Sequence, residues 1–237
     1  PLPNTAHGEN ATAEAWTLLG RAHRAAGEEA LALSAFNQAL DLRPGTAHVR
    51  ALRGDLLRRL GDPAGAAARH LRKATAALPD DPGLRLLQAL LAHTLDRPGR
   101  ARDALAAYHA RLDGSPAETA VKLDYCLRAA GQPKAALARL RRHANRSDAS
   151  ANLGHFLAYA EGAMPANAVL AYARAPEGAA PSPRDHCAAA FWLAQHHLAL
   201  GEPAPARRLL STATETELPE TTEYHLARHQ RETRPEK

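Results

Sequence analysis

The strongest constraint on the fold is a 34-residue pattern from Ala13 to Thr46, in which large and small apolar residues recur at helical spacing. The key positions of this pattern are Trp16, Leu19, Gly20, Gly27, Ala32, Phe36, Ala39 and Pro44. Because Ala32, Phe36 and Ala39 recur at helical spacing, they would form one stripe along a second helix that faces a first. Glycine between the two helices permits a turn, and proline ends the second helix. The pattern predicts a pair of antiparallel helices.

The same pair is predicted to repeat along the chain. Gly54 would occupy the position in the second unit that Gly20 occupies in the first. Turns that combine glycine or aspartate with proline recur at Gly61-Asp62-Pro63, Asp96-Arg97-Pro98-Gly99, Gly131-Gln132-Pro133 and Gly201-Glu202-Pro203. Proline after such a turn suits the first turn of a helix, where its missing N–H costs no hydrogen bond. Repeated helix pairs stack into a solenoid, because each pair buries its apolar face against its neighbours.

We therefore expect an all-α fold, a right-handed superhelical solenoid of stacked antiparallel helix pairs with a C-terminal capping helix. The expected boundaries are a flexible segment at 1–12, regular repeats at 13–143, an irregular helical pair at 150–175, a linker at 176–183, a last repeat with its capping helix at 184–231 and a flexible tail at 232–237. Residues 13–231 would form one continuous domain. Aromatic residues make up only 4% of the chain, and its abundant alanine and leucine favour helix over strand.

Composition argues against nucleic acid as a partner. The formal net charge is +5, but the basic residues are spread along the chain, and aromatic residues that could stack on bases are scarce. Two cysteines, Cys126 and Cys187, lie far apart within expected helices. We interpret both as small buried side chains and not as a disulfide framework.

No motif indicates catalysis, a cofactor or a metal ion. The chain has no GxSxG nucleophile motif, phosphate-binding glycine loop or dinucleotide-binding fingerprint. His225 and His229 would share one helix face, as zinc ligands at i and i+4 do, but no third ligand accompanies them in the sequence. The prediction is a protein that is not an enzyme and that binds no cofactor.

In a solenoid of helix pairs the first helices line the concave surface, which is the usual ligand surface. The expected concave positions are rich in cations in the N-terminal half. The candidate partner-binding residues are Arg21, Arg24, His48, Asp55, Arg58, Arg59, His93, Tyr125 and Arg128. Arginine binds carboxylates through paired hydrogen bonds, so the expected ligands are acidic segments or C-termini of protein partners. The alternative is that these arginines are solvated and that their stems cover the alanine-rich helices.

The positions of the 13–46 pattern resemble the signature of the tetratricopeptide repeat, and the likeness extends over residues 13–231. This resemblance implies protein–protein interaction and not a reaction. Regular repeats, an irregular stretch and a final repeat also look like the arrangement of bacterial NlpI-type outer-membrane lipoproteins. Residues 189–201 and 223–227 resemble the end of that family, although its lipidated N-terminal cysteine is not part of this sequence.

Resemblance to the NlpI type implies a homodimeric periplasmic adaptor that holds peptidoglycan hydrolases and delivers them to a protease. The alternatives are a cytoplasmic adaptor, an assembly factor for secretion or pili, and a helical repeat that contacts nucleic acid. A periplasmic or outer-membrane location is favoured over the cytoplasm, with membrane attachment expected only through a missing N-terminal anchor. Open solenoid ends and an apolar groove centre are compatible with a homodimer.

Overall fold

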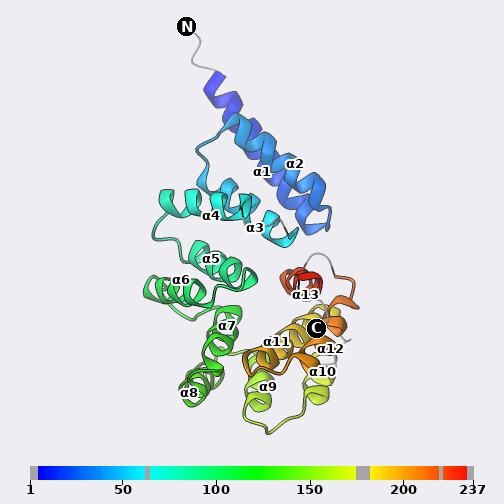
Figure 1. The fold of residues 1–237 in the computed structure, drawn as a ribbon. Helices are drawn as coiled ribbons and strands as arrows, with labels where there is room; N and C mark the ends of the chain where they lie inside the picture. Colours follow the sequence, from blue (N-terminus) through cyan, green and yellow to red (C-terminus); the bar gives the residue numbers. More distant parts are fainter. Residues whose placement is uncertain (1–4, 62–64, 175–181, 219–220, 234–237) are drawn as a thin grey trace. The chain divides into compact units, whose positions relative to one another are not determined.

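The computed structural model describes residues 5–61, 65–174, 182–218 and 221–233, and every regular element within them is an α-helix (Figure 1). The helices in these ranges are α1 (Thr5–Ala25), α2 (Glu29–Leu42), α3 (Ala47–Arg59), α4 (Ala66–Ala77), α5 (Pro82–Thr94), α6 (Pro98–Ala110), α7 (Glu118–Ala129), α8 (Pro133–Ala144), α9 (Ala151–Ala160), α10 (Ala166–Arg174), α11 (Pro183–Ala199), α12 (Pro203–Thr214) and α13 (Thr222–Thr233). None of these helices is long and apolar enough to cross a membrane. The expected all-α class is confirmed. The linker expected at 176–183 and the end of the expected tail lie largely outside the described residues.

The helices form two compact units, Pro1–Arg111 and Leu112–Lys237. In the first unit α1 packs with α2, α3 with α4 and α5 with α6. In the second unit α7 packs with α8 and α11 with α12, while α9 and α10 contact each other and α11. Both units are thus built from helices that pack on the next helix along the chain. The single continuous domain expected at 13–231 stays a prediction.

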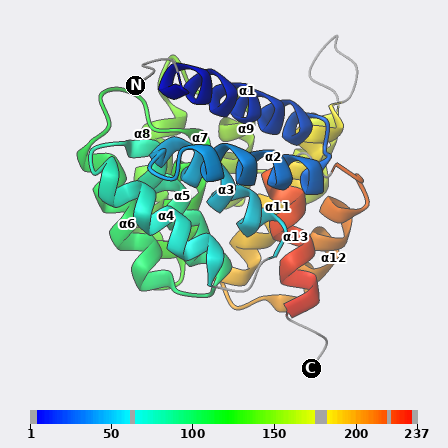
Figure 2. The ribbon, with the colours of Figure 1, turned by 90° about the horizontal axis from the view of Figure 1, so that it is seen from above.

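The first helix pair shows why the glycine of the repeat pattern matters. Helices α1 and α2 lie side by side along their length (Figures 1 and 2). A Cβ atom on Gly20 of α1 would lie only 2.6 Å from Cε1 of Phe36 on α2. Glycine at this position therefore leaves room for the Phe36 ring, as the pattern predicts. Gly54 plays the same part in the next pair, because a Cβ atom there would lie 3.0 Å from Cγ of Leu71 on α4.

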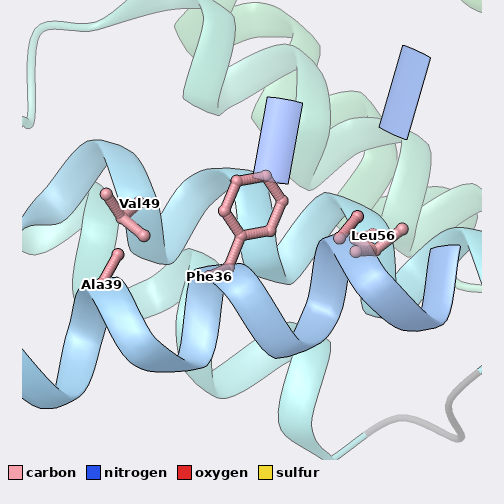
Figure 3. Close-up of a cluster of buried hydrophobic side chains, with 5 residues drawn as sticks. Phe36, Ala39, Val49 and Leu56 are labelled. Carbon is pink, nitrogen blue, oxygen red and sulfur yellow. The ribbon is translucent and has the colours of Figure 1, made fainter. Parts of the chain in front are cut away.

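A buried apolar cluster joins α2 to α3. Phe36 and Ala39 of α2 lie with Val49 and Leu56 of α3 (Figure 3), and all four side chains are buried. Trp16 of α1 packs against this cluster and is itself partly buried. The stripe predicted on α2 is therefore the side of the helix that packs against its neighbours.

Left-handed backbone conformation marks several turns between paired helices. Gly27, after α1, and Gly201, after α11, each have φ near 77°. At the corresponding turn after α5 the residue is Asp96, with φ of 53°. This conformation is unfavourable for a residue with a Cβ atom, although aspartate tolerates it better than most. The turns lie where the glycine and proline segments of the sequence predict them.

Two features of the first helix differ from expectation. Helix α1 begins at Thr5, so residues 5–12 of the segment expected to be flexible are helical. Leu19, one of the key apolar positions of the repeat pattern, is 41% exposed, and its neighbour Leu18 is 63% exposed. Helix α1 packs mainly against α2, and among the described residues no earlier helix covers its other side. The repeat pattern predicts an apolar face but not whether a neighbour is present to bury it.

Helix α11 lies at the centre of the second unit. It contacts α7, α9, α10, α12 and α13, and its residues Phe191, Trp192 and Leu193 are almost completely buried. Helix α13 packs on α11 and α12, where the sequence predicts a capping helix. Cys126 on α7 and Cys187 on α11 are buried free thiols, as expected, and burial raises the pKa of the Cys126 thiol.

Candidate protein-binding surfaces

Three of the predicted partner-binding residues form one ion-pair network in the first unit. Asp55 of α3 accepts hydrogen bonds from Nε and Nη2 of Arg58, one turn further along, at 3.1 and 2.6 Å. Its other oxygen, Oδ2, lies 3.5 Å from Nη1 of Arg24 on α1. The Arg58 side chain is only 1% exposed, which is rare for arginine. The charges of Arg24 and Arg58 are therefore used within the fold.

A second buried pair lies beside this network. Nη2 of Arg59 on α3 lies 3.2 Å from Oε1 of Glu29 on α2, and both side chains are largely buried. Burial lowers the pKa of Arg59 below its usual value, while the charges of Glu29 and Asp55 oppose that shift. Arginine nevertheless remains protonated at neutral pH. The pair fixes the end of α3 against the start of α2.

Two other predicted partner-binding residues of the first unit are exposed. Arg21 of α1 and His48 of α3 lie at the surface, and neither side chain makes a hydrogen bond or ion pair within the described part of the chain. His93 on α5 is half-buried. Of the seven predicted residues in this unit, Arg21 and His48 are therefore the two most available to a partner.

The two predicted residues of the second unit, Tyr125 and Arg128, both lie on α7. Tyr125 is buried, its hydroxyl lies 3.0 Å from Nδ1 of His196, and the two rings stack with centroids 5.7 Å apart. Nε of Arg128 donates to Oδ1 of Asp124 at 2.8 Å, while Arg139 of α8 donates to the other oxygen at 2.8 Å. Tyr125 is thus a core residue that joins α7 to α11, and it is not exposed in a groove.

His197, near the end of α11 and next to His196, joins a group of hydrogen-bonded side chains in the second unit. Nε2 of His197 lies 2.6 Å from the hydroxyl of Tyr159 on α9, and its Nδ1 lies 2.6 Å from Oε2 of Glu202. Neither histidine belongs to a metal-binding group, since no three His, Cys, Asp or Glu side chains of the described ranges gather in that way. These two hydrogen bonds of His197 instead hold α9 and the α11–α12 turn together.

The buried position of His196 predicts a pH-dependent stability. Burial and the nearby charge of His197 lower the pKa of His196 to about 4, whereas an unfolded histidine titrates near about 6.5. The unfolded state therefore binds this proton more readily, and stability should fall as pH drops from about 6.5 towards about 4. We expect His196→Gln to reduce the loss of unfolding free energy between pH 7 and pH 4.5 by about 2 kcal/mol.

This effect can be read in the second unit alone. The chain has two tryptophans, Trp16 in the first unit and Trp192 in the second, so a Trp16→Phe background leaves only the reporter on α11. Urea unfolding of this background at both pH values, with and without His196→Gln, measures the difference. His229→Gln, at a half-buried histidine of the same unit, is the control. An unchanged pH dependence in the His196 variant would contradict the assignment.

The second unit also contains a pocket of about 250 Å³ between α7, α9, α10, α11 and α13. Five charged residues line it, Glu118, Lys122, Arg184, Asp185 and Glu223. Lys122 pairs with Glu118, and its Nζ lies 5.6 Å from the centroid of the Phe156 ring. Burial would raise the pKa of Glu118, but the charge and hydrogen bonds of Lys122, with a hydrogen bond from Ser150, hold it below its usual value. This ion pair uses the charges of Lys122 and Glu118 only, and Arg184, Asp185 and Glu223 also line the pocket.

Comparison with known families identifies one part of the chain directly. Residues 13–46 match the family model described as tetratricopeptide repeat. These are the residues whose pattern predicts a helix pair, and in the structure they form most of α1 together with α2. The match confirms the repeat that the sequence pattern indicated.

Among solved structures, the chain is similar to PilW, described as a widely conserved type IV pilus biogenesis factor. The TM-score is 0.56 at 15% sequence identity, and the match covers 90% of this chain and 96% of that one. Likeness at this level of identity shows the fold. No curated protein matches the sequence. The match to PilW does not single out the NlpI type, so that resemblance stays a prediction. The match to the tetratricopeptide-repeat model is confined to residues 13–46, and the structural likeness shows that the helix pairs that follow share an all-α fold with PilW.

Proposed function

We propose that this protein is a non-catalytic scaffold that binds other proteins. The observation that carries this proposal is the tetratricopeptide repeat at residues 13–46, followed by further helix pairs in both units. Stacked helix pairs present long helix faces, and such faces are suited to binding segments of partner proteins. The ion pairs of Arg24 with Asp55 and of Arg59 with Glu29 support the same interpretation, because they link α1 and α2 to α3.

In the first unit the proposed contact surface lies on the first helices of the pairs. Arg21 on α1 and His48 on α3 are exposed, and neither side chain makes a hydrogen bond or ion pair with the described residues. An exposed arginine can bind a carboxylate through two parallel hydrogen bonds. Acidic segments or C-termini of proteins are therefore the proposed ligands of this surface, while Arg24, Asp55, Arg58 and Arg59 support it from within.

The proposed setting is the assembly of pili or a related secreted structure. PilW is described as a type IV pilus biogenesis factor, and its fold matches over nearly the whole of both chains. This favours an assembly factor over the adaptor of peptidoglycan hydrolases that the NlpI type would imply. The two settings predict different partners, which can be distinguished by identifying the bound proteins.

Site-specific crosslinking in the native host tests the proposal. The photoreactive residue p-benzoylphenylalanine would replace Arg21, and separately Arg207, which is exposed on α12 in the second unit. We expect ultraviolet light to produce discrete crosslinked species from position 21, with pilus or secretion components identified by mass spectrometry. Identification of peptidoglycan hydrolases instead would support the alternative setting. The same non-specific products from both positions, or none from position 21, would contradict the proposed surface.

A further inference from the structure

A groove in the first unit lies between α4 and α6, with α5 as its base. Its volume is about 350 Å³. Each helix contributes residues at helical spacing, so one face of each helix lines the groove. The lining includes four arginines and one aspartate, together with leucines and alanines. None of its residues is among the partner-binding candidates that the sequence pattern suggests.

The base of this α4–α6 groove is apolar. Leu71 of α4 and Leu91 of α5 are buried members of one apolar cluster of the first unit, and Leu95 packs against that cluster while still partly exposed. Ala104 and Ala107 of α6 line the facing wall and are half-buried. Small wall residues over a leucine base leave space that an apolar side chain of a ligand could fill. A ligand with charge alone would leave this part of the groove unused.

The rim of the groove carries unused positive charge. Arg72, Arg97 and Arg100 are exposed, and none of their side chains makes a hydrogen bond or ion pair with the described residues. This contrasts with Arg58 and Arg59 of α3, which are buried and paired. Asp103 is the one acidic residue of the lining, so the groove has a clear excess of cations.

The fourth arginine of the groove is fixed by the fold. Nη2 of Arg85 donates to the carbonyl oxygen of Pro79 at 3.1 Å, and its Nη1 donates to Oε1 of Gln88 at 3.3 Å. Gln88 in turn donates to Oγ1 of Thr75 on α4 at 2.8 Å. These contacts hold α5 against α4 and fix the position of Arg85 on one side of the groove. Arg85 adds positive charge without needing to be ordered by a ligand.

The start of α6 adds to the same charge. Arg97 and Arg100 flank the first turn of α6, which contains no acidic residue and has no side-chain cap. The free N–H groups at a helix start carry partial positive charge. The rim next to them is therefore the most favourable place in the groove for a carboxylate.

We infer that the α4–α6 groove binds an acidic, leucine-bearing segment of a partner protein. Carboxylates would pair with Arg72, Arg97 and Arg100, while an apolar side chain would contact Leu91 and Leu95. No aromatic side chain lines the groove, so it offers no platform for stacked bases. The apolar base and narrow volume suit a peptide side chain better than an extended lipid surface. This inference rests on the proposed scaffold function and assigns it a second surface with a defined ligand chemistry.

The inference can be tested with a synthetic probe. The probe is a fluorescein-labelled peptide with leucines at i and i+4 flanked by glutamates, and its binding to the full chain is followed by fluorescence polarisation. We expect saturable binding that weakens as salt rises, because exposed charges are screened. A peptide with glutamine in place of every glutamate should bind far more weakly. Arg72→Glu/Arg100→Glu should weaken binding of the acidic peptide by about tenfold or more.

Matched variants separate the groove from general charge. Arg207→Glu/Arg208→Glu makes the same charge change at exposed positions of α12 and should alter binding by less than about twofold. Ala107→Trp, which fills the groove without changing charge, should also weaken binding, and circular dichroism checks that each variant is folded. No binding of the acidic peptide, or equal losses in the two double variants, would overturn the inference. The inference would also be overturned if Arg72→Glu/Arg100→Glu abolished co-sedimentation with phosphatidylglycerol vesicles but left peptide binding unchanged.

The peptide assay and the crosslinking experiment can fail separately. If the photoreactive residue at position 21 crosslinks to a partner but the acidic peptide does not bind to the groove, the groove assignment is wrong and the scaffold function stands. If neither position 21 nor the groove binds a protein or peptide, both proposals are wrong.

Discussion

Replacing Asp55 by alanine should lower the free energy of unfolding of the first unit by about 3–5 kcal/mol, because it leaves buried arginine charge without its acceptor. Arg58 makes both of its side-chain hydrogen bonds to Asp55, and its side chain is 1% exposed. The positive charge could not reach water without moving α3. Urea unfolding in a Trp192→Phe background can be followed through Trp16, which lies in this unit.

A second substitution distinguishes loss of the ion pair from loss of packing. Asp55→Ala combined with Arg58→Met removes both charges and keeps an apolar side chain in the same space, so it should recover at least half of the lost stability. Asp41→Ala, at an exposed position of α2, is the control and should change stability by less than about 0.5 kcal/mol. If the double variant is no more stable than Asp55→Ala, unpaired charge is not the cause.

Phe36→Ala should be about as damaging, with an expected loss of about 3–5 kcal/mol in the same assay. Phe36 is completely buried between α1 and α3, and its ring fills the space that Gly20 leaves open. Removing the ring would leave a cavity next to Leu56 that the flanking helices cannot easily close. The expected loss therefore includes the lost apolar burial and the cost of the cavity.

The control for this prediction is Leu31→Ala on the same helix. Leu31 is 52% exposed, so its truncation should cost less than about 1 kcal/mol. If Phe36→Ala and Leu31→Ala lower the stability of the first unit equally, the ring of Phe36 does not carry the packing that its burial implies.

The sequence predicted the helix pairs because their determinants are local. Gly20, Gly54 and the glycine–proline turns lie at fixed spacings, and each acts on residues of its own pair or turn. The packing position of Phe36 was predicted correctly for the same reason, because its place in a single helical stripe determines which side of α2 it lies on. Such features require knowledge of period and residue size but not of distant contacts.

The predicted partner-binding residues were harder to place, because their surroundings depend on other helices. Tyr125 has the spacing of a groove residue, yet its partner His196 lies 71 positions further along the chain. Arg58 was expected at the surface, but Asp55 is close enough to neutralise it within the fold. An i, i+3 pair of opposite charge on one helix is a signal that could have indicated this pairing. The sequence did not predict the α4–α6 groove, because three helices form it together and none of them alone carries a pattern that indicates it.

The burial of both native thiols has a practical consequence for experiments on this protein. Cys187 is inaccessible to solvent and Cys126 is nearly so, and a thiol with a raised pKa is a poor nucleophile at neutral pH. A maleimide dye should therefore react almost exclusively with a cysteine introduced at the surface, without prior removal of the natural ones. Arg21→Cys and Arg100→Cys would each give a singly labelled protein, so that occupancy of the two proposed surfaces could be followed independently in solution.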